Sequence, residues 1–275
     1  MKNIIKFGLL SVAVCASLLG CAKKNDQQAP KLVMVTEATF PPYEFREGEK
    51  IVGIDVEIVS AIAKELGREL VVEDTKFDSV IPAVQAGKAD LAASGITVTE
   101  DRKQTINFTI PYVEAAQVIV VPGDSSIKTP ADLKGKRIGV QSGTTGDSYV
   151  TEKIQEPERF ENAPLAVAAM KGGKVDVVVC DKDPARVFVS MDSTIKILGE
   201  PLTKEEYAIA ISKKNPELLA KANVVIQKLK DSGELASIIK KYEAKPAVEA
   251  APVVEAKPVV EAKPAVEAKP TAETK

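Results

Sequence analysis

The chain has 275 residues, and its 37 basic and 39 acidic side chains leave a formal net charge of −2. Because the positive and negative charges nearly cancel, we do not expect nucleic acid as a partner, since nucleic-acid binding relies on a basic surface. The chain has no histidine, which removes the usual proton-transfer residue and a common metal ligand, and we expect no metal or other cofactor.

The N-terminal residues have the pattern of a lipoprotein signal. Two lysines precede an apolar run over 7–19, and a glycine then leads to Cys21. The tetrad Leu-Leu-Gly-Cys at 18–21 resembles the lipobox of bacterial lipoproteins, whose cysteine is lipidated and becomes the mature N-terminus. We therefore expect a signal peptide over 1–20 and a short tether over 21–30 that begins at Cys21. Acyl chains such as palmitate on Cys21 would anchor the protein to a membrane outside the cytoplasm, on the periplasmic side in a Gram-negative cell. An ordinary signal peptide that is cleaved elsewhere is the alternative.

The cysteine positions fit an exported protein without disulfides. Cys15 lies in the predicted signal peptide and Cys21 would carry lipid, so Cys180 is left alone in the folded part. The long patterned middle of the chain must then form a core that needs no covalent support.

Between residues 31 and 242, short β-rich runs alternate with helical patterns. The predicted strands cover 31–36, 69–72, 89–93, 117–121, 137–140, 175–180, 194–197 and 207–211. The predicted helices cover 55–66, 78–86, 145–154, 164–171, 183–191, 216–230 and 234–242. This alternation predicts an α/β fold with largely parallel sheets that are covered by helices. Two sets of strands, with a possible crossing at 112–121, indicate two lobes whose strand ends face a shared cleft.

The C-terminal segment over 243–275 repeats six-residue units such as KPAVEA and KPVVEA. A proline in every unit opposes both a helix and a central strand. We expect a disordered or extended tail, partly polyproline II, and favour an inert solvated segment over a binding site for a partner.

The stretch ASGITVTEDRKQTINFTIPY at 93–112 places a hydroxyl-rich loop before Arg102. Thr99 can cap a helical turn that begins at Glu100. Loop amides, the Thr97 hydroxyl and the Arg102 side chain could then bind one carboxylate, because a planar guanidinium matches a carboxylate with two parallel hydrogen bonds. From these residues alone, an ion pair between Arg102 and a neighbouring acid on a solvated surface is an equal alternative.

Several longer motifs follow one another in a familiar order. They are VTEATFPPYEF, GIDVEIVSAIAKEL, FDSVIPAVQAGKADLAASGIT, GKRIGVQSGTTG and VDVVVCDKDPA. With the arginine stretch, they resemble the bacterial family 3 extracellular solute-binding proteins, which serve ATP-driven importers of polar amino acids. The resemblance implies two Rossmann-like lobes of periplasmic-binding-protein type II, joined by two crossing strands, with lobe one over 31–111 and 208–242 and lobe two over 112–207. It also implies a protein that is not an enzyme and that delivers a free amino acid to an ABC permease in the inner membrane, and we expect a monomer.

The resemblance assigns roles at both charged ends of an amino-acid ligand. Arg102 matches the arginine that binds the α-carboxylate, with Thr97 beside it, and Thr145 lies at a helix start whose free amides favour an anion. Gly95 would offer a backbone group near the α-ammonium. Asp181 matches the acid that receives the α-ammonium, and its alternative role is an N-cap of the following helix. The full set of ligand-binding residues that the resemblance implies is Glu37, Phe40, Phe77, Gly95, Thr97, Arg102, Gln141, Thr145 and Asp181.

The remaining matched residues would surround the ligand side chain. Phe40 and Phe77 match aromatic residues on two sides of the ligand, and each would otherwise be ordinary core. Glu37 matches a position that is acidic in several relatives and could reach a distal cation, while Gln141 and Glu206 are weaker candidates. A flat aromatic pocket with an acid favours a basic amino acid, lysine or arginine.

Two other functions are open on the sequence. A catalytic relative of the fold, such as a dehydratase, could use Glu37, Cys180 and Asp181 as acid and base, although Cys180 ends an apolar run and fits a buried structural thiol. A surface lipoprotein that senses a ligand without coupling to transport is the third possibility.

Overall fold

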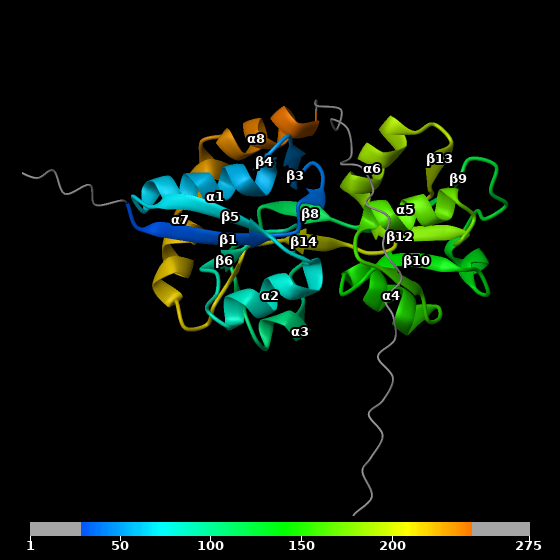
Figure 1. Cartoon of the computed structure of the whole chain (residues 1–275), viewed down its shortest axis with the longest axis horizontal. Coiled ribbons are helices and arrows are strands. Elements are labelled where there is room, and N and C mark those ends of the chain that lie inside the picture. Colours follow the sequence, from blue (N-terminus) through cyan, green and yellow to red (C-terminus); the bar gives the residue numbers. More distant parts are fainter. Residues whose placement is uncertain (1–28, 244–275) are drawn as a thin grey trace, which may run out of the picture.

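The computed structural model describes residues 29–243, which form two lobes lying side by side (Figure 1). The predicted signal peptide, the predicted lipidation site Cys21, most of the tether and nearly all of the repeat tail fall outside the described residues. Within 29–243, every helix is too short or too polar to cross a membrane.

The first lobe contains a five-stranded mixed sheet in the order β5, β1, β6, β15, β7. The strands are β1 (Lys31–Thr36), β5 (Glu69–Asp74), β6 (Leu91–Ala92), β7 (Asn107–Phe108) and β15 (Ala210–Ile211). β1 pairs with β5 and β6 in parallel, whereas β15 is antiparallel to β6 and β7. The helices are α1 (Ile54–Glu65), α2 (Phe77–Gln85), α3 (Glu100–Lys103), α7 (Pro216–Asp231) and α8 (Glu234–Glu243). α1, α7 and α8 cover one face through a large apolar core, and α2 and α3 lie on the opposite side (Figure 1).

The second lobe repeats this plan with the order β11, β10, β12, β9, β13. The strands are β9 (Gln117–Pro122), β10 (Ile138–Gln141), β11 (Glu158–Phe160), β12 (Val177–Asp181) and β13 (Ile195–Leu198). The helices are α4 (Thr145–Lys153), α5 (Ala163–Lys171) and α6 (Lys182–Met191), with a 3-10 turn η1 at Pro130–Leu133. An apolar cluster lies on each face of this sheet: one packs under α4, and the other packs under α5 and α6.

Two short antiparallel strands connect the lobes. β8 (Val113–Ala115) leads from the first lobe into the second, and β14 (Glu205–Tyr207) leads back, with Glu206 opposite Glu114 in the register. Figure 1 shows the pair between the two sheets. The predicted fold class, two lobes of an α/β type joined by two crossing strands, is therefore confirmed.

Sequence patterns account for most helix boundaries. In α1, Ile58 and Ile62 are fully buried one turn apart, and Gly67 adopts the left-handed conformation (φ 62°) that ends the helix as predicted. Gly87 plays the same part after α2, with φ 73°. The observed helices begin and end within about one residue of the predicted ones.

A small three-stranded meander was not predicted. It consists of β2 (Thr39–Phe40), β3 (Glu44–Glu47) and β4 (Lys50–Val52), and it leads directly into α1. Gly53 makes this entry possible, because at φ 141° a Cβ atom there would lie 2.0 Å from the carbonyl oxygen of Tyr43. The meander thus fixes Phe40 and Glu44 against the first lobe.

The sheets differ from the expectation of largely parallel pairing. Each holds four strands that run in one sense and one, β15 or β9, that runs in the opposite sense, because β9 and β15 enter their sheets directly from the crossing strands. The strand predicted at 207–211 is in fact two strands, β14 in the crossing pair and β15 in the first sheet.

Candidate functional site

A narrow cavity of about 10 Å³, enough for roughly one water molecule, lies between the lobes. It is bounded by the ends of β6, β10 and β12, where a two-lobed α/β protein is expected to hold its ligand. All of the candidate residues from the sequence line this cavity except Glu37 and the weaker candidate Glu206, and Thr144 joins them. The lining residues are Phe40, Phe77, Gly95, Thr97, Arg102, Gln141, Thr144, Thr145 and Asp181.

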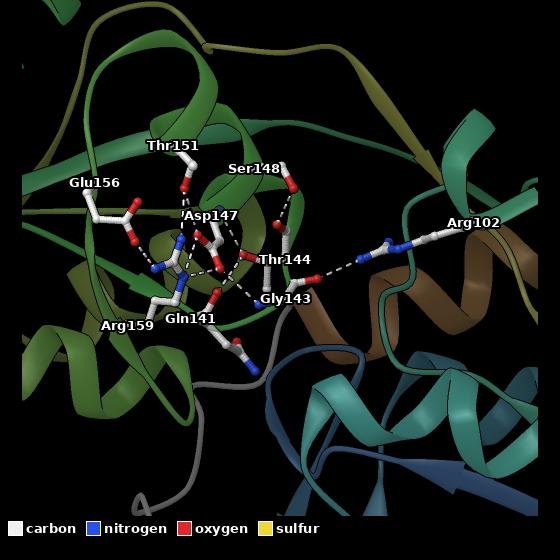
Figure 2. Close-up of polar contacts among 9 residues, drawn as sticks. All are labelled: Arg102, Gln141, Gly143, Thr144, Asp147, Ser148, Thr151, Glu156 and Arg159. Atoms are coloured by element: carbon white, nitrogen blue, oxygen red, sulfur yellow. Dashed lines mark hydrogen bonds and ion pairs between the residues drawn. The ribbon is translucent and has the colours of Figure 1, made fainter.

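Arg102 joins the two lobes through backbone carbonyls. Its Nη1 donates to the Thr97 carbonyl at 2.8 Å. Its Nη2 donates to the Gly143 carbonyl of the second lobe at 3.0 Å (Figure 2). The guanidinium also lies over the Phe77 ring, 5.5 Å from its centre. Thr99 caps α3 by accepting from the Arg102 N–H, as predicted. Arg102 is therefore directed into the cavity, and the alternative of an ion pair on a solvated surface does not describe it.

The Gly143 loop is held by charge and capping interactions within the second lobe. The Thr144 hydroxyl accepts from the Asp147 N–H at 3.2 Å and so caps α4. Asp147 accepts from the Gly143 N–H at 3.1 Å and from Arg159 Nε at 2.9 Å, and Arg159 also pairs with Glu156 (Figure 2). This network fixes the carbonyl that Arg102 meets.

Asp181 is buried at the end of β12, 6 % exposed. It occupies the N-cap position of α6 but makes no capping hydrogen bond, so the N-cap alternative is wrong for its side chain. Its carboxyl accepts from the Tyr207 hydroxyl instead. Burial raises the pKa of Asp181 to about 7, a rise that Tyr207 opposes and the charge of Glu205 increases. A cation placed against Asp181 would favour its ionised form.

Gly95 must be glycine for the cavity to exist in this form. At φ 52°, a Cβ atom would lie 2.5 Å from the Phe40 ring. The Gly95 N–H donates to Asp55 at 2.9 Å, which leaves the Gly95 carbonyl as the backbone group available to a ligand. A carbonyl is an acceptor, which suits an ammonium group.

Two completely buried acids support this loop from behind. Glu44 accepts from the Ser94 hydroxyl at 3.1 Å, and the same hydroxyl accepts from the Glu37 N–H at 3.0 Å. Burial raises the pKa of Asp55 to about 6 and that of Glu44 well above its ordinary value, with the charge of Asp55 adding to the second effect. Sequence reasoning missed this pair, although both acids stand inside apolar runs, YEF and GIDV.

Glu37 lies beside the cavity instead of lining it. Its carboxyl accepts from the Thr39 hydroxyl at 2.7 Å. Burial raises the pKa of Glu37 to about 7; Thr39 opposes the rise, and the nearby Gln141 amide does so more weakly. Gln141 lines the cavity, and its buried Nε2 has no hydrogen-bond partner among residues 29–243. Glu37 and Gln141 together form a polar end of the site.

Sequence reasoning also missed Glu205, which lies on the crossing strand β14. Its carboxylate accepts from the hydroxyls of Thr97 and Thr145, each at 2.8 Å. Glu206, the weaker candidate from the sequence, is exposed, because successive strand residues face opposite sides. Two adjacent acids in the segment KEEY were the available signal, but only the three-dimensional arrangement decides which one meets Thr97 and Thr145.

Known proteins resemble the chain over its whole described length. The family model of the bacterial extracellular solute-binding proteins, family 3, matches residues 32–245. The arginine-binding extracellular protein ArtP of Bacillus subtilis is 34 % identical over 86 % of this chain and 97 % of its own length. The ABC transporter arginine-binding protein 1 of Escherichia coli is 31 % identical over 82 % of this chain and 96 % of its own. The crystal structures of the arginine-, lysine-, histidine-binding protein ArtJ from Geobacillus stearothermophilus include a chain with 34 % identity and a TM-score of 0.74, covering 78 % of this chain and 96 % of that one.

The buried acids predict how stability depends on pH without ligand. The pKa of Glu37 is raised to about 7, so the folded protein holds a proton there that the unfolded chain releases near 4.5. This contribution is complete below the unfolded value and is lost as pH rises through about 7. Glu37→Gln should therefore flatten the fall in unfolding free energy between about pH 5 and about pH 7, by up to roughly 1.4 kcal/mol per pH unit.

Urea denaturation at several pH values measures this slope. The matched control is Glu200→Gln, which removes an exposed carboxyl and should leave the slope of the wild type. Parallel curves for wild type and Glu37→Gln would contradict the prediction.

Proposed function

The chain belongs to the bacterial extracellular solute-binding proteins of family 3, and we propose that it binds a basic amino acid, arginine or lysine, between its lobes and delivers it to an ABC permease. One observation carries the proposal: Arg102 of the first lobe and Asp181 of the second line the same cavity. An amino acid leaves water only if both its charges meet partners, so binding would require both lobes.

The charges around the cavity favour a ligand that carries an extra cation. Arg102 is the only cation among the described residues that line the cavity, and the acids Asp181, Glu205 and Glu37 lie in or beside it. The α-ammonium of a neutral amino acid would offset the charge of one acid, and its α-carboxylate would bind the one arginine. A basic amino acid brings a second cation, which would meet Glu37 at the polar end of the site.

The cavity walls suit a flat or long cationic side chain. Phe77 already accepts a guanidinium over its ring, that of Arg102, at 5.5 Å from the ring centre. Phe40 also lines the cavity, where its buried ring lies against Gly95. A ligand guanidinium or ammonium between these rings would gain a cation–π contact before it reaches Glu37 and Gln141.

The ligand carboxylate would bind Arg102 by replacing one of its backbone partners. One arm of the guanidinium donates to the Gly143 carbonyl. A ligand carboxylate offers a stronger, charge-assisted acceptor at that place, and the N-terminus of α4 provides free N–H groups beside it. Similar proteins support this class of ligand, because ArtP is named for arginine and ArtJ for arginine, lysine and histidine.

We propose binding without turnover. Cys180, the thiol that a catalytic relative could use, is 5 % exposed, and burial raises the pKa of its thiol, away from the thiolate that a nucleophile requires. Prolonged incubation with amino acids followed by chromatography tests this view: we expect unchanged amino acid, and any new product would contradict it.

Replacing Arg102 tests the carboxylate assignment. Arg102→Ala should weaken arginine binding by roughly 2 to 5 kcal/mol, because a buried ligand carboxylate would lose its charged partner. Calorimetric titration measures the loss. Lys103→Ala, on the same short helix, removes an exposed cation that pairs with Glu100 and should leave the affinity unchanged. Equal affinities for the two variants would refute the role of Arg102.

We also propose that lipid on Cys21 holds the protein at the outer side of the inner membrane or at another envelope membrane. The lipobox-like tetrad at 18–21 supports this. Cys21→Ala should abolish incorporation of labelled palmitate and move the protein from the membrane fraction to the soluble envelope fraction, because no acyl chain can attach. Cys180→Ala is the matched control and should keep the label. Unchanged label and fractionation in Cys21→Ala would contradict the proposal.

A further inference from the structure

Glu205 receives hydrogen bonds from both lobes and from the crossing region. Its Oε2 accepts from the Thr97 hydroxyl of the first lobe and the Thr145 hydroxyl of the second, both at 2.8 Å. The Gln117 amide approaches the same oxygen at 3.5 Å, and the Thr203 hydroxyl donates to Oε1 at 2.7 Å. β14, which carries Glu205, lies between the lobes in Figure 1. One carboxylate therefore orders the hydroxyls on both walls of the cavity.

The position of each hydroxyl proton follows from this geometry. A carboxylate can only accept, so the single protons of Thr97 and Thr145 point at Glu205. Thr145 also accepts from the Gln117 amide at 3.1 Å. What remains for the cavity is acceptor capacity: two lone pairs on Thr97 and one on Thr145. Neither hydroxyl can then donate to a ligand carboxylate.

We propose that Glu205 is a positioning residue that makes Thr97 and Thr145 acceptors, so that this part of the cavity selects ligands carrying an α-ammonium group. The inference rests on the proposed function and adds a basis for its specificity. An ammonium has three N–H donors. The carboxylate of Asp181, the Thr97 hydroxyl and the Gly95 carbonyl are acceptors that line the same cavity, and Arg102 serves the ligand carboxylate without competition from the hydroxyls.

The negative field of Glu205 supports the same division of the site. Its charge raises the pKa of the neighbouring Asp181 and opposes the fall in the pKa of Arg102 that burial causes. The carboxylate of Asp181 thus lines the cavity with the charge of Glu205 nearby, while the guanidinium donates to the Gly143 loop. Removing the Glu205 oxygens would free the threonine protons and let them donate to a carboxylate or to water.

The test compares two ligands that differ by one group. L-arginine carries the α-ammonium, and δ-guanidinovalerate is the same molecule without its α-amino group. Calorimetry gives the ratio of their affinities for the wild type and for two variants. Glu205→Met keeps the side-chain length without an acceptor oxygen, and Glu205→Gln keeps one oxygen that can still accept from both threonines.

Glu205→Met should lower the preference for arginine at least about tenfold and change the affinity for δ-guanidinovalerate by less than about threefold. Glu205→Gln should retain the preference of the wild type within about threefold, because the acceptor and not the charge sets the proton positions. Glu206→Met, one residue away and exposed, is the matched control and should behave as the wild type.

Equal losses for both ligands, an unchanged ratio in Glu205→Met, or a Glu205→Gln variant as impaired as Glu205→Met would each overturn the inference. If Glu205→Met does not fold by circular dichroism, Thr97→Val gives the same reading, because it removes the acceptor that Glu205 orients. Thr97→Val should lose the preference for arginine, and Thr97→Ser should keep it. A wild type that binds no basic amino acid would instead refute the proposed function itself.

Discussion

A guanidinium that leaves water must keep hydrogen-bond acceptors around it, and Arg102 finds one on each lobe. Nη1 meets the Thr97 carbonyl and Nη2 meets the Gly143 carbonyl, so a single side chain links the two halves of the cavity. The loop that offers Gly143 is in turn fixed by Asp147 and Arg159. The shape of the site therefore depends on one partly buried cation, and we propose that a ligand carboxylate replaces its second partner.

Four buried acids lie at the cavity or behind the loop that forms it. Glu37, Glu44, Asp55 and Asp181 are each less than one tenth exposed, and burial raises the pKa of all four. Glu44 and Asp55 support the Gly95 loop from behind, where no ligand reaches. Glu37 and Asp181 lie at the cavity, where a cation can reach them. The protein thus holds acids that become more favourably ionised when a cationic ligand enters.

The sequence predicts the regular part of this architecture because long elements carry clear periodicity. β1 and the helices were found nearly to the residue, whereas the meander β2 to β4 and the crossing strands β8 and β14 are too short to show alternation. The direction of each strand could not be predicted from the sequence either, because it depends on where the chain crosses between the lobes.

Among site residues, Arg102 and Asp181 follow from motif resemblance, and the structure brings them to one cavity. The part played by Glu205 could not be predicted in this way. Its neighbour Glu206 has the same side chain, and only the pairing of β14 with β8 determines which acid meets Thr97 and Thr145.

The most direct test of the account is a calorimetric comparison of arginine with citrulline, which has nearly the same shape but no side-chain charge. With one arginine lining the cavity and three acids in or beside it, the protein should bind arginine at least about a hundredfold more tightly than citrulline, because only arginine supplies the second cation. Equal affinities, or tighter binding of citrulline, would contradict the claim that charge balance between the lobes selects the ligand.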